Sequence, residues 1–377
     1  MTGSSWDVAV VGGGVMGMAS ALFLARGGMR VVLLERDQLC RGASGVNAGT
    51  LTLHMTRAAL VPYALRGFRM WQGAEHWLGR GVDAVATDGL CLAFTPAEAE
   101  LLAERVRLRR AAGAPVALID AAEARRIEPG LSPAVLLAAH SPIDGHARAH
   151  LTGLAFRGAL TAAGVEIRES CSVRRIEPGG AGFQLETDAG RLAVRRLVLA
   201  GGAWLGGLLG LLGVEIAVKA LVNQLAVTER LAQVMRSVLT IASGLLSLKQ
   251  FANGTVLIGG GWQGRGDLAS GGTAIIEENL CGNLRLAAWT VPRLEVARIV
   301  RVWLGFEAET EDAMPLVGPV PGVPGAFVIG AVHSGYTSGP FMGRLLAQTL
   351  LGEAPELPLF DPARLLPAKE TLKGAAA

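Results

Sequence analysis

The chain has 377 residues, a formal net charge of +3 and a hydrophobic share of 51%. This length exceeds what one hydrophobic core usually needs, so we expect two domains. The charge is mild, and its densest basic run, at 105–110, has a helical pattern beside acidic residues. That pattern is typical of a solvated helix face and argues against a nucleic-acid-binding protein. The four cysteines form no CxxC pair, which argues against zinc and iron–sulfur motifs.

The first residues lead directly into an apolar strand pattern, without a visible signal peptide, and we expect a cytoplasmic protein. One uncharged stretch, 197–214, is long enough to raise the question of a membrane span. Its six glycines favour a buried strand, a turn and a short helix instead. We therefore expect no membrane span.

The N-terminal stretch has the order of a βαβ dinucleotide-binding unit. The apolar run Val8–Val11 leads into Gly12, Gly14 and Gly17, which are spaced as G-x-G-x-x-G. In such a unit the first glycine allows the tight turn and the second lets the backbone approach a pyrophosphate. The third glycine lets the following helix, here over 18–26, pack closely on the strand. The pattern predicts a nucleotide at this turn.

Two further features make this interpretation more specific. The helix N-terminus, at Val15 and Met16, offers free N–H groups and a positive dipole end to phosphates. Glu35 ends the second strand pattern, where a carboxylate accepts hydrogen bonds from a ribose. An ordinary tight turn between a strand and a helix would not need that carboxylate.

Strand and helix patterns alternate along most of the chain. Strand patterns occur at 90–94, 165–167, 183–187, 191–194, 197–200, 256–261 and 327–331, and helical patterns at 52–80, 96–112, 149–163 and 339–350. A short turn at 188–190 joins two of these strands into a β-meander. We therefore predict an α/β protein: a Rossmann-like nucleotide-binding domain with a parallel sheet and a β-meander, plus an inserted α+β domain with a mixed sheet.

We place the nucleotide-binding domain in three separate segments, 1–85, 143–215 and 311–365. The second domain, which would hold a substrate, takes 86–142 and 216–310. Residues 366–377 are expected to form a frayed tail.

Four motifs together resemble the FAD-dependent D-amino acid oxidase superfamily, in its glycine oxidase and sarcosine oxidase branch. They are the unit 8–36, the segment RGASGVNAG at 41–49, the segment VLAGGAW at 198–204, and 312–319 running into GAVHSGYTSGP at 330–340. The resemblance covers nearly the whole chain. Each motif alone is weak, but the four in this order are specific.

The resemblance implies that FAD is the cofactor and that residues from all four motifs contact it. The implied contact residues are Gly12, Gly14, Val15, Met16, Gly17, Glu35, Arg36, Ala43, Ser44, Asn47, Ala48, Gly49, Leu51, Val173, Gly201, Trp204, Gly305, Gly330, His333, Ser334, Gly335, Tyr336 and Thr337. Backbone N–H groups of the turn 333–337 are suited to stabilise the N1/C2=O end of a reduced flavin. For Ser44 and Asn47, plain helix capping stays open as an alternative.

The resemblance also implies that an amine is oxidised by hydride transfer to flavin N5 and that the product imine then hydrolyses. No acid–base residue is needed if the amine binds neutral, and a dry pocket lowers the pKa of an amine. We therefore predict substrate-lining residues instead of a catalytic triad, namely His54, Arg57, Lys249, Gln250, Glu307 and Tyr336.

No metal site is expected. His146 and His150 are spaced as two ligands on one helix face would be, but no third ligand is in view. We interpret them as the exposed start of a helix that Asp144 and Gly145 cap.

Glu307 departs from the pattern of the glycine oxidase branch, which has an arginine for the substrate carboxylate in this strand. A carboxylate at this place repels a substrate carboxylate and attracts a guanidinium or a secondary ammonium group. An alternative interpretation, to which we give equal weight, is that Glu307 faces solvent or a partner chain.

The segment 248–264 is similar to the β subunits of heteromeric opine oxidase, D-hydroxyproline dehydrogenase and sarcosine oxidase. Such subunits bind FAD and hold the amine-oxidising site, and a partner subunit carries the electrons onward. We therefore expect the catalytic β subunit of an opine or imino-acid oxidase, with a partner subunit and with a second flavin, FMN, at the subunit contact as a further cofactor.

Two alternatives stay open. One is a free-standing glycine or D-amino acid oxidase that uses O2, with Arg57 or Arg301 as the clamp for the substrate carboxylate. The other is a FAD-binding electron-relay subunit without a substrate of its own.

Overall fold

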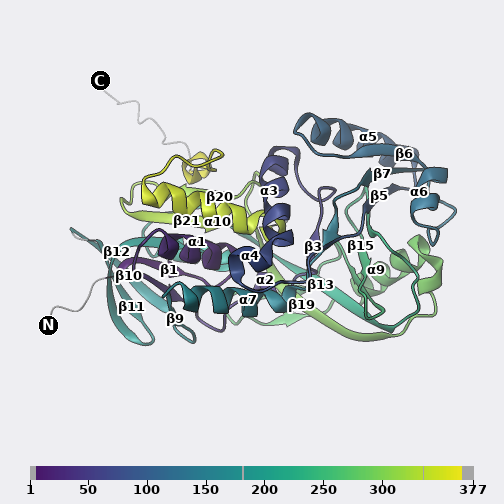
Figure 1. The fold of residues 1–377 in the computed structure, drawn as a ribbon. Helices are drawn as coiled ribbons and strands as arrows, with labels where there is room; N and C mark the ends of the chain where they lie inside the picture. Colours follow the sequence, from purple (N-terminus) through teal and green to yellow (C-terminus); the bar gives the residue numbers. More distant parts are fainter. Residues whose placement is uncertain (1–5, 181, 334, 367–377) are drawn as a thin grey trace, which may run out of the picture.

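The computed structural model describes residues 6–180, 182–333 and 335–366 (Figure 1). Two eight-stranded sheets form the framework of this part of the chain. The strands of the first sheet come from three segments, 6–34, 166–199 and 316–330, and those of the second from 89–141 and 219–309. We propose that each sheet is the core of one domain, with the boundaries expected from the sequence.

The first sheet is mostly parallel, with an antiparallel extension. Its strands are β1 (Trp6–Val11), β2 (Val31–Leu34), β9 (Glu166–Arg168), β10 (Val173–Gly179), β11 (Gly182–Thr187), β12 (Gly190–Leu199), β20 (Leu316–Pro319) and β21 (Ala326–Gly330). Strands β1, β2, β9, β12 and β21 are parallel, so their carboxyl ends meet at one edge of the sheet. In open sheets of this kind ligands bind at that edge.

The alternation of side chains along β1 explains why both faces of this sheet are covered. Val8 and Val10 point into a core shared with helices α1 (Val15–Arg26) and α10 (Gly335–Leu351). Ala9 and Val11 point into a second core on the other face, shared with the β-meander. Strands buried on both faces read as continuous apolar runs, which is the pattern of the sequence here.

The β-meander differs from the expectation in one respect. The two strands expected at 191–194 and 197–200 are one ten-residue strand, β12, which ends at Leu199. Its first half pairs antiparallel with β11 and its second half pairs parallel with β1. Arg195 and Arg196 are exposed at the point where β12 changes partner. The two charged residues interrupt the apolar pattern of the sequence and suggest two strands, although the backbone continues as one strand.

Helix α10 begins at Gly335, four residues before the expected start, so Pro340 lies in the interior of the helix and not in its first turn. A proline lacks the N–H that would donate to the carbonyl four residues earlier, here that of Tyr336. The indole N–H of Trp71 donates to this carbonyl instead, at 2.8 Å. A tertiary contact thus satisfies the group that the proline leaves open, and no local pattern could reveal it.

The expected helix over 52–80 is interrupted. Residues 52–57 form a loop, followed by a 3-10 turn, α3 (Val61–Gln72) and α4 (Ala74–Leu78). Buried Asp144 accepts hydrogen bonds from the Thr52 hydroxyl and from the Leu53 N–H. These bonds hold residues 52 and 53 in a loop conformation. The expectation that Asp144 caps a helix was therefore wrong.

His146 was also placed wrongly by the sequence pattern. It is buried in the short strand β8 (Gly145–His146), which pairs with β3 (Thr50–Leu51) and β4 (Val85–Ala86). Helix α7 (Ala149–Ala162) begins only three residues later, so His146 and His150 do not share a helix face.

The second sheet is mixed and has the order β19-β13-β16-β15-β14-β5-β7-β6. Its strands are β5 (Gly89–Ala93), β6 (Ala117–Asp120), β7 (Leu137–Ser141), β13 (Lys219–Arg230), β14 (Val238–Ile241), β15 (Ser247–Gln250), β16 (Thr255–Gly259) and β19 (Ile299–Glu309). The main helices of this part are α5 (Pro96–Ala111), α6 (Ala121–Ile127) and α9 (Glu277–Thr290). In Figure 1, β13 and β19 run from this sheet back toward the first one.

The uncharged stretch 197–214 forms the end of β12, a 3-10 turn and the short helix α8 (Leu205–Gly210), as the sequence predicts. In the part of the chain that the structure describes, no helix combines the length and the apolar character that a membrane crossing requires.

Candidate active site

Two adjoining cavities follow the carboxyl edge of the first sheet and reach the second sheet. The turn cavity, about 640 Å³, is lined by the glycine turn after β1, by Glu35 and Arg36, and by Trp204. The inner cavity, about 440 Å³, lies between β13, β19 and the loop before α10. Both cavities are bordered by Ser44 of the short helix α2 (Ala43–Val46) and by Gly305 of β19. Together they form one elongated binding region.

The glycine turn brings the N-terminus of α1 to the cavities. Gly12 has a φ of +117°, and a Cβ there would lie 2.3 Å from the Ala200 carbonyl oxygen. A Cβ on Gly17 would lie 2.0 Å from the Gly12 carbonyl oxygen. Helix α1 begins after Gly14, which has no side chain that could cap the helix. Its first turn carries no acidic residue that would repel a phosphate. The Val15 N–H already donates to the Ser44 hydroxyl, so the other N–H groups of the first turn and the positive dipole end are what fit a pyrophosphate.

The Glu35 carboxylate is held rigidly at the turn cavity. One oxygen accepts from the Gly13 N–H at 2.7 Å and the other from the Asp37 N–H at 2.9 Å. The Arg36 guanidinium stacks over the Trp204 ring at 3.5 Å and forms a neighbouring wall. A fixed carboxylate with lone pairs to spare fits the hydroxyl groups of a ribose.

Glu35→Ala is expected to weaken FAD retention, because it removes a charged acceptor and loosens the turn. Hydrogen bonds to charged groups contribute roughly 1.5–3 kcal/mol, or about 10- to 100-fold in Kd. Flavin content and the Kd for FAD measure the effect. Glu166→Ala, the same change at a half-buried glutamate of β9 in the same sheet that lines neither cavity, is the control. An unchanged Kd in Glu35→Ala would remove the ribose role.

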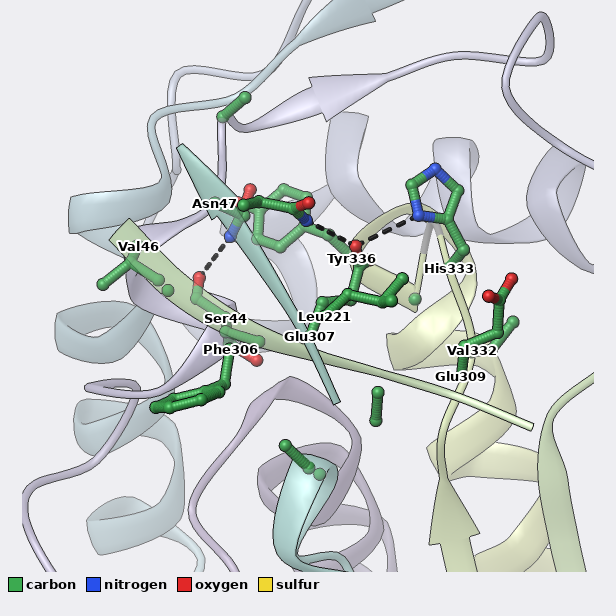
Figure 2. Close-up of a pocket in the computed structure, with 18 of the residues that line it drawn as sticks. Ser44, Val46, Asn47, Leu221, Phe306, Glu307, Glu309, Val332, His333 and Tyr336 are labelled. Atoms are coloured by element: carbon green, nitrogen blue, oxygen red, sulfur yellow. Dashed lines mark hydrogen bonds and ion pairs between the residues drawn. The ribbon is translucent and has the colours of Figure 1, made fainter. Parts of the chain in front are cut away.

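Ser44 and Asn47 shape the loop beside the cavity with their side chains. The Ser44 hydroxyl accepts from the Val15 N–H at 2.9 Å and thereby ties α2 to the start of α1. The Asn47 side chain donates to the Ser44 carbonyl (Figure 2). It also accepts from the Gly49 N–H. Both residues line the inner cavity, and their capping contacts set the course of this loop.

A second helix N-terminus, that of α10, also reaches the inner cavity. Gly335 and Tyr336 line the cavity, and the first turn of α10 carries no acidic residue. The Tyr336 ring stacks on Trp71 with centroids 4.6 Å apart, and its hydroxyl shares a 2.7 Å hydrogen bond with that of Thr152. Burial raises the pKa of this phenol above its ordinary value. Tyr336 thus contributes a fixed ring surface.

Glu307 lies in the inner cavity and has polar partners on two sides (Figure 2). Its carboxylate accepts from the Asn223 amide at 2.6 Å and pairs with His333 Nδ1 at 3.1 Å. Burial lowers the pKa of His333, but the adjacent Glu307 carboxylate outweighs burial, and the pKa is raised above its ordinary value. The pair thus brings opposite charges to the cavity wall as the pH falls.

A second charge pair lies at the same wall. Arg57 Nη2 and Glu309 Oε1 are 3.2 Å apart, and both side chains line the inner cavity. Arg57 is the only Arg or Lys among the described residues that line this cavity. A substrate carboxylate entering here would have Arg57 as its permanent cation.

The structure separates the other predicted substrate residues. Lys249 is buried, and its ammonium group contacts the hydroxyl of Thr50, which lines the inner cavity. His54 is buried away from both cavities, with Nε2 3.2 Å from the Gly89 carbonyl oxygen. Gln250 organises a nearby turn by accepting from the Val234 N–H. Only Lys249 of these three is next to the inner cavity.

The predicted cofactor contacts fall into two groups. Those that line one or both cavities are Gly12, Gly14, Val15, Met16, Gly17, Glu35, Arg36, Ala43, Ser44, Asn47, Ala48, Val173, Gly201, Trp204, Gly305, Gly330, His333, Gly335 and Tyr336. Gly49, Leu51 and Thr337 lie behind the lining, and Ser334 lies outside the described residues.

Sequence reasoning did not find Asn223 and Glu309. Glu309 follows Glu307 by two residues on β19, and side chains two apart in a strand share a face, so this signal was available. Asn223 is brought opposite Gly305 only by the pairing of β13 with β19. Across the described residues no group of three or more His, Cys, Asp or Glu side chains is placed to hold a metal ion.

The fold, the glycine turn, the fixed carboxylate and the two converging helix N-termini define a flavin-dependent oxidoreductase. A family model described as DAO, FAD dependent oxidoreductase, matches residues 7–349. The chain belongs to this family, and its cofactor is FAD.

Three known proteins show the range of the similarity. Glycine oxidase from Geobacillus kaustophilus is 31% identical over 91% of this chain and 92% of its own. An opine oxidase subunit from Rhizobium meliloti is 28% identical over 88% of this chain and 89% of its own. The crystal structure of the Geobacillus kaustophilus glycine oxidase aligns with a TM-score of 0.87, at 27% identity, over 97% of this chain and 99% of that one.

Proposed function

We propose that this chain oxidises the C–N bond of a primary or secondary amino acid of the opine or imino-acid type in the inner cavity. FAD bound in the two cavities would accept a hydride from the carbon that carries the nitrogen. The main support for this proposal is that four ionisable side chains line the same cavity as the residues of the cofactor region. These side chains are Arg57, Glu307, Glu309 and His333. The glycine oxidase and opine oxidase relatives support the same class of reaction.

In this proposal the side chains bind and orient the substrate. Arg57 would take a carboxylate, and Glu307 and Glu309 would attract the nitrogen or a second cationic group. The apolar wall of Leu221 and Phe306 would limit water, which favours the neutral amine needed for hydride loss. The rate gain would come mainly from orientation.

We further propose that the chain is the catalytic β subunit of a heteromeric complex. Its similarity to the opine oxidase subunit from Rhizobium meliloti supports this assignment. A third cavity of about 440 Å³, lined by Arg148, Arg301 and Trp303 among others, shares Val46 and Asn47 with the inner cavity. Its guanidinium groups and indole ring suit the phosphate and ring of a second flavin at a subunit contact.

The cytoplasmic location also stays a proposal. The four cysteines, Cys40, Cys91, Cys171 and Cys281, are free thiols, as a reducing compartment would keep them.

Turnover with two electron acceptors tests the function. The purified chain, loaded with FAD, is assayed for carbonyl product, an oxo acid or formaldehyde, with glycine, sarcosine, proline and an arginine-derived opine, using either O2 or an artificial dye. Product formation with the dye and little with O2 is expected. Rapid O2 consumption with glycine would favour the free-standing oxidase, and no product with any amine would favour the electron-relay subunit.

A further inference from the structure

A buried polar cluster lies directly behind the inner cavity. It consists of the Lys249 amino group, the Thr50 hydroxyl and the His146 ring. Lys249 is 1% exposed and His146 is 7% exposed. Thr50 lines the inner cavity and so separates Lys249 from the space in which the substrate would bind.

The fold fixes these three groups from three different elements. Strand β15 carries Lys249, and the pairing of β3 with β8 sets Thr50 opposite His146. The Thr50 carbonyl accepts from the Thr337 hydroxyl at 3.3 Å, which ties the threonine to the start of α10. The Phe251 ring packs edge-on against His146, with centroids 4.9 Å apart. The Thr50 hydroxyl is therefore held between Lys249 and the cavity.

The surroundings of Lys249 favour its neutral amine. Burial lowers its pKa to about 7. Burial is also the first cause that lowers the pKa of His146 to about 4, and the charges of Lys249 and Arg148 lower it further. Among the described residues, no carboxylate contributes to the pKa of Lys249, so burial is not offset. At pH 8 the amine is thus a proton acceptor.

A lysine at this position needs a reason beyond packing. Burying an amine costs free energy that a methionine of similar length would not cost. Buried titratable groups with shifted pKa values beside a cavity are concentrated at functional sites. Lys249 was predicted to line the substrate site, but it lies behind Thr50, and neither the cofactor contacts nor the substrate contacts proposed from the structure make use of it.

We infer that Lys249, acting through the Thr50 hydroxyl, takes up a proton when the flavin is reduced, and that this proton comes from the substrate amine. The origin of the proton rests on the proposed function. An N–H bond of the substrate ammonium group breaks, and its proton passes to Thr50 Oγ1. The proton of the Thr50 hydroxyl passes at the same time to Lys249 Nζ. No electrons move in this step, because the electron pair leaves the substrate with the hydride.

The step also balances charge. Hydride transfer adds negative charge inside a cavity that excludes water. Protonated Lys249 places a positive charge one hydroxyl group away from that cavity. Opposite charges at such short range attract strongly in a low-dielectric interior, so proton uptake and cofactor reduction favour each other.

Proton uptake during reduction without substrate tests the role of Lys249. Holoenzyme is photoreduced anaerobically at pH 8 in weak buffer with an indicator dye. Wild type is expected to take up about one more proton per flavin than Lys249→Met, by linkage. Lys219→Met, the same change at an exposed lysine, is the control and should match wild type. Flavin content and Tm show whether each variant is folded.

Flavin reduction by sarcosine then tests the path of the proton. In wild type the rate constant for anaerobic flavin reduction should fall as the pH drops through about 7. In Lys249→Met this decrease should be absent. Thr50→Val keeps the size of the side chain and removes the relay, and should slow reduction about 10- to 100-fold while proton uptake stays as in wild type.

The outcomes separate the two proposals. Equal proton uptake by wild type and Lys249→Met overturns the assignment of Lys249, whatever the substrate. A wild-type rate in Thr50→Val overturns the relay. If uptake differs but no amine reduces the flavin, the proposed function fails and Lys249 stands as the proton acceptor of flavin reduction.

Discussion

Gly12→Ala is expected to yield a chain that is nearly free of FAD. The added Cβ would lie 2.3 Å from the Ala200 carbonyl oxygen and 2.7 Å from its carbonyl carbon, and both are backbone atoms that follow directly on the end of β12. The φ of +117° adds strain that an alanine rarely tolerates. The turn must therefore shift, and the N-terminus of α1 moves away from the pyrophosphate position.

Gly28→Ala is the matched control for this change. Gly28 also has a positive φ, +87°, but a Cβ there meets nothing within 4 Å. It should lose about 1 kcal/mol of stability from backbone strain and keep its FAD. The ratio of flavin to protein absorbance, with Tm beside it, measures both variants. Full FAD content in Gly12→Ala would show that the turn does not set the cofactor position.

The second large effect is expected for Glu307→Arg. This change puts a guanidinium in the inner cavity where the carboxylate now accepts from Asn223 and pairs with His333. Like charges brought together in such a site cost several kcal/mol, and each 1.4 kcal/mol is a factor of ten. The ratio of kcat/KM for a small anionic amine to that for an arginine-derived opine should therefore rise by about 100-fold.

Two variants separate charge from structure at this site. Glu307→Gln keeps an acceptor for Asn223 but removes the charge, and should show a smaller shift in the same direction. Glu311→Arg makes the same charge change at an exposed residue outside the cavity, and should leave the ratio unchanged. An unchanged ratio in Glu307→Arg would mean that Glu307 does not face the substrate.

Local patterns allowed most of the first sheet and its ligand-binding edge to be predicted. The apolar run of β1, the glycine spacing and Glu35 are determined within about one βαβ unit, so the sequence alone identifies them. Helix α5 was predicted with its start at Pro96 and to within one residue at its end, and the structure shows that Thr95 and Glu98 form a capping box at this start.

The remainder depends on contacts between distant segments. His54 follows the flavin loop in the sequence, yet the loop turns it into the protein toward Gly89, 35 residues away. Gln250 is adjacent to Lys249, but alternation along β15 sends the two side chains to opposite faces. Trp71 supports Pro340 from a different helix. No pattern within one segment carries this information.

The central claim is that an amino acid in the inner cavity reduces the bound FAD. Anaerobic mixing of the FAD-loaded chain with the amine panel, followed by the visible absorbance of oxidised flavin, tests it most directly. We expect that at least one amine bleaches the flavin within the first turnover and that Gly12→Ala shows no such signal. Flavin that stays oxidised with every amine, and yet is bleached by dithionite, would contradict it.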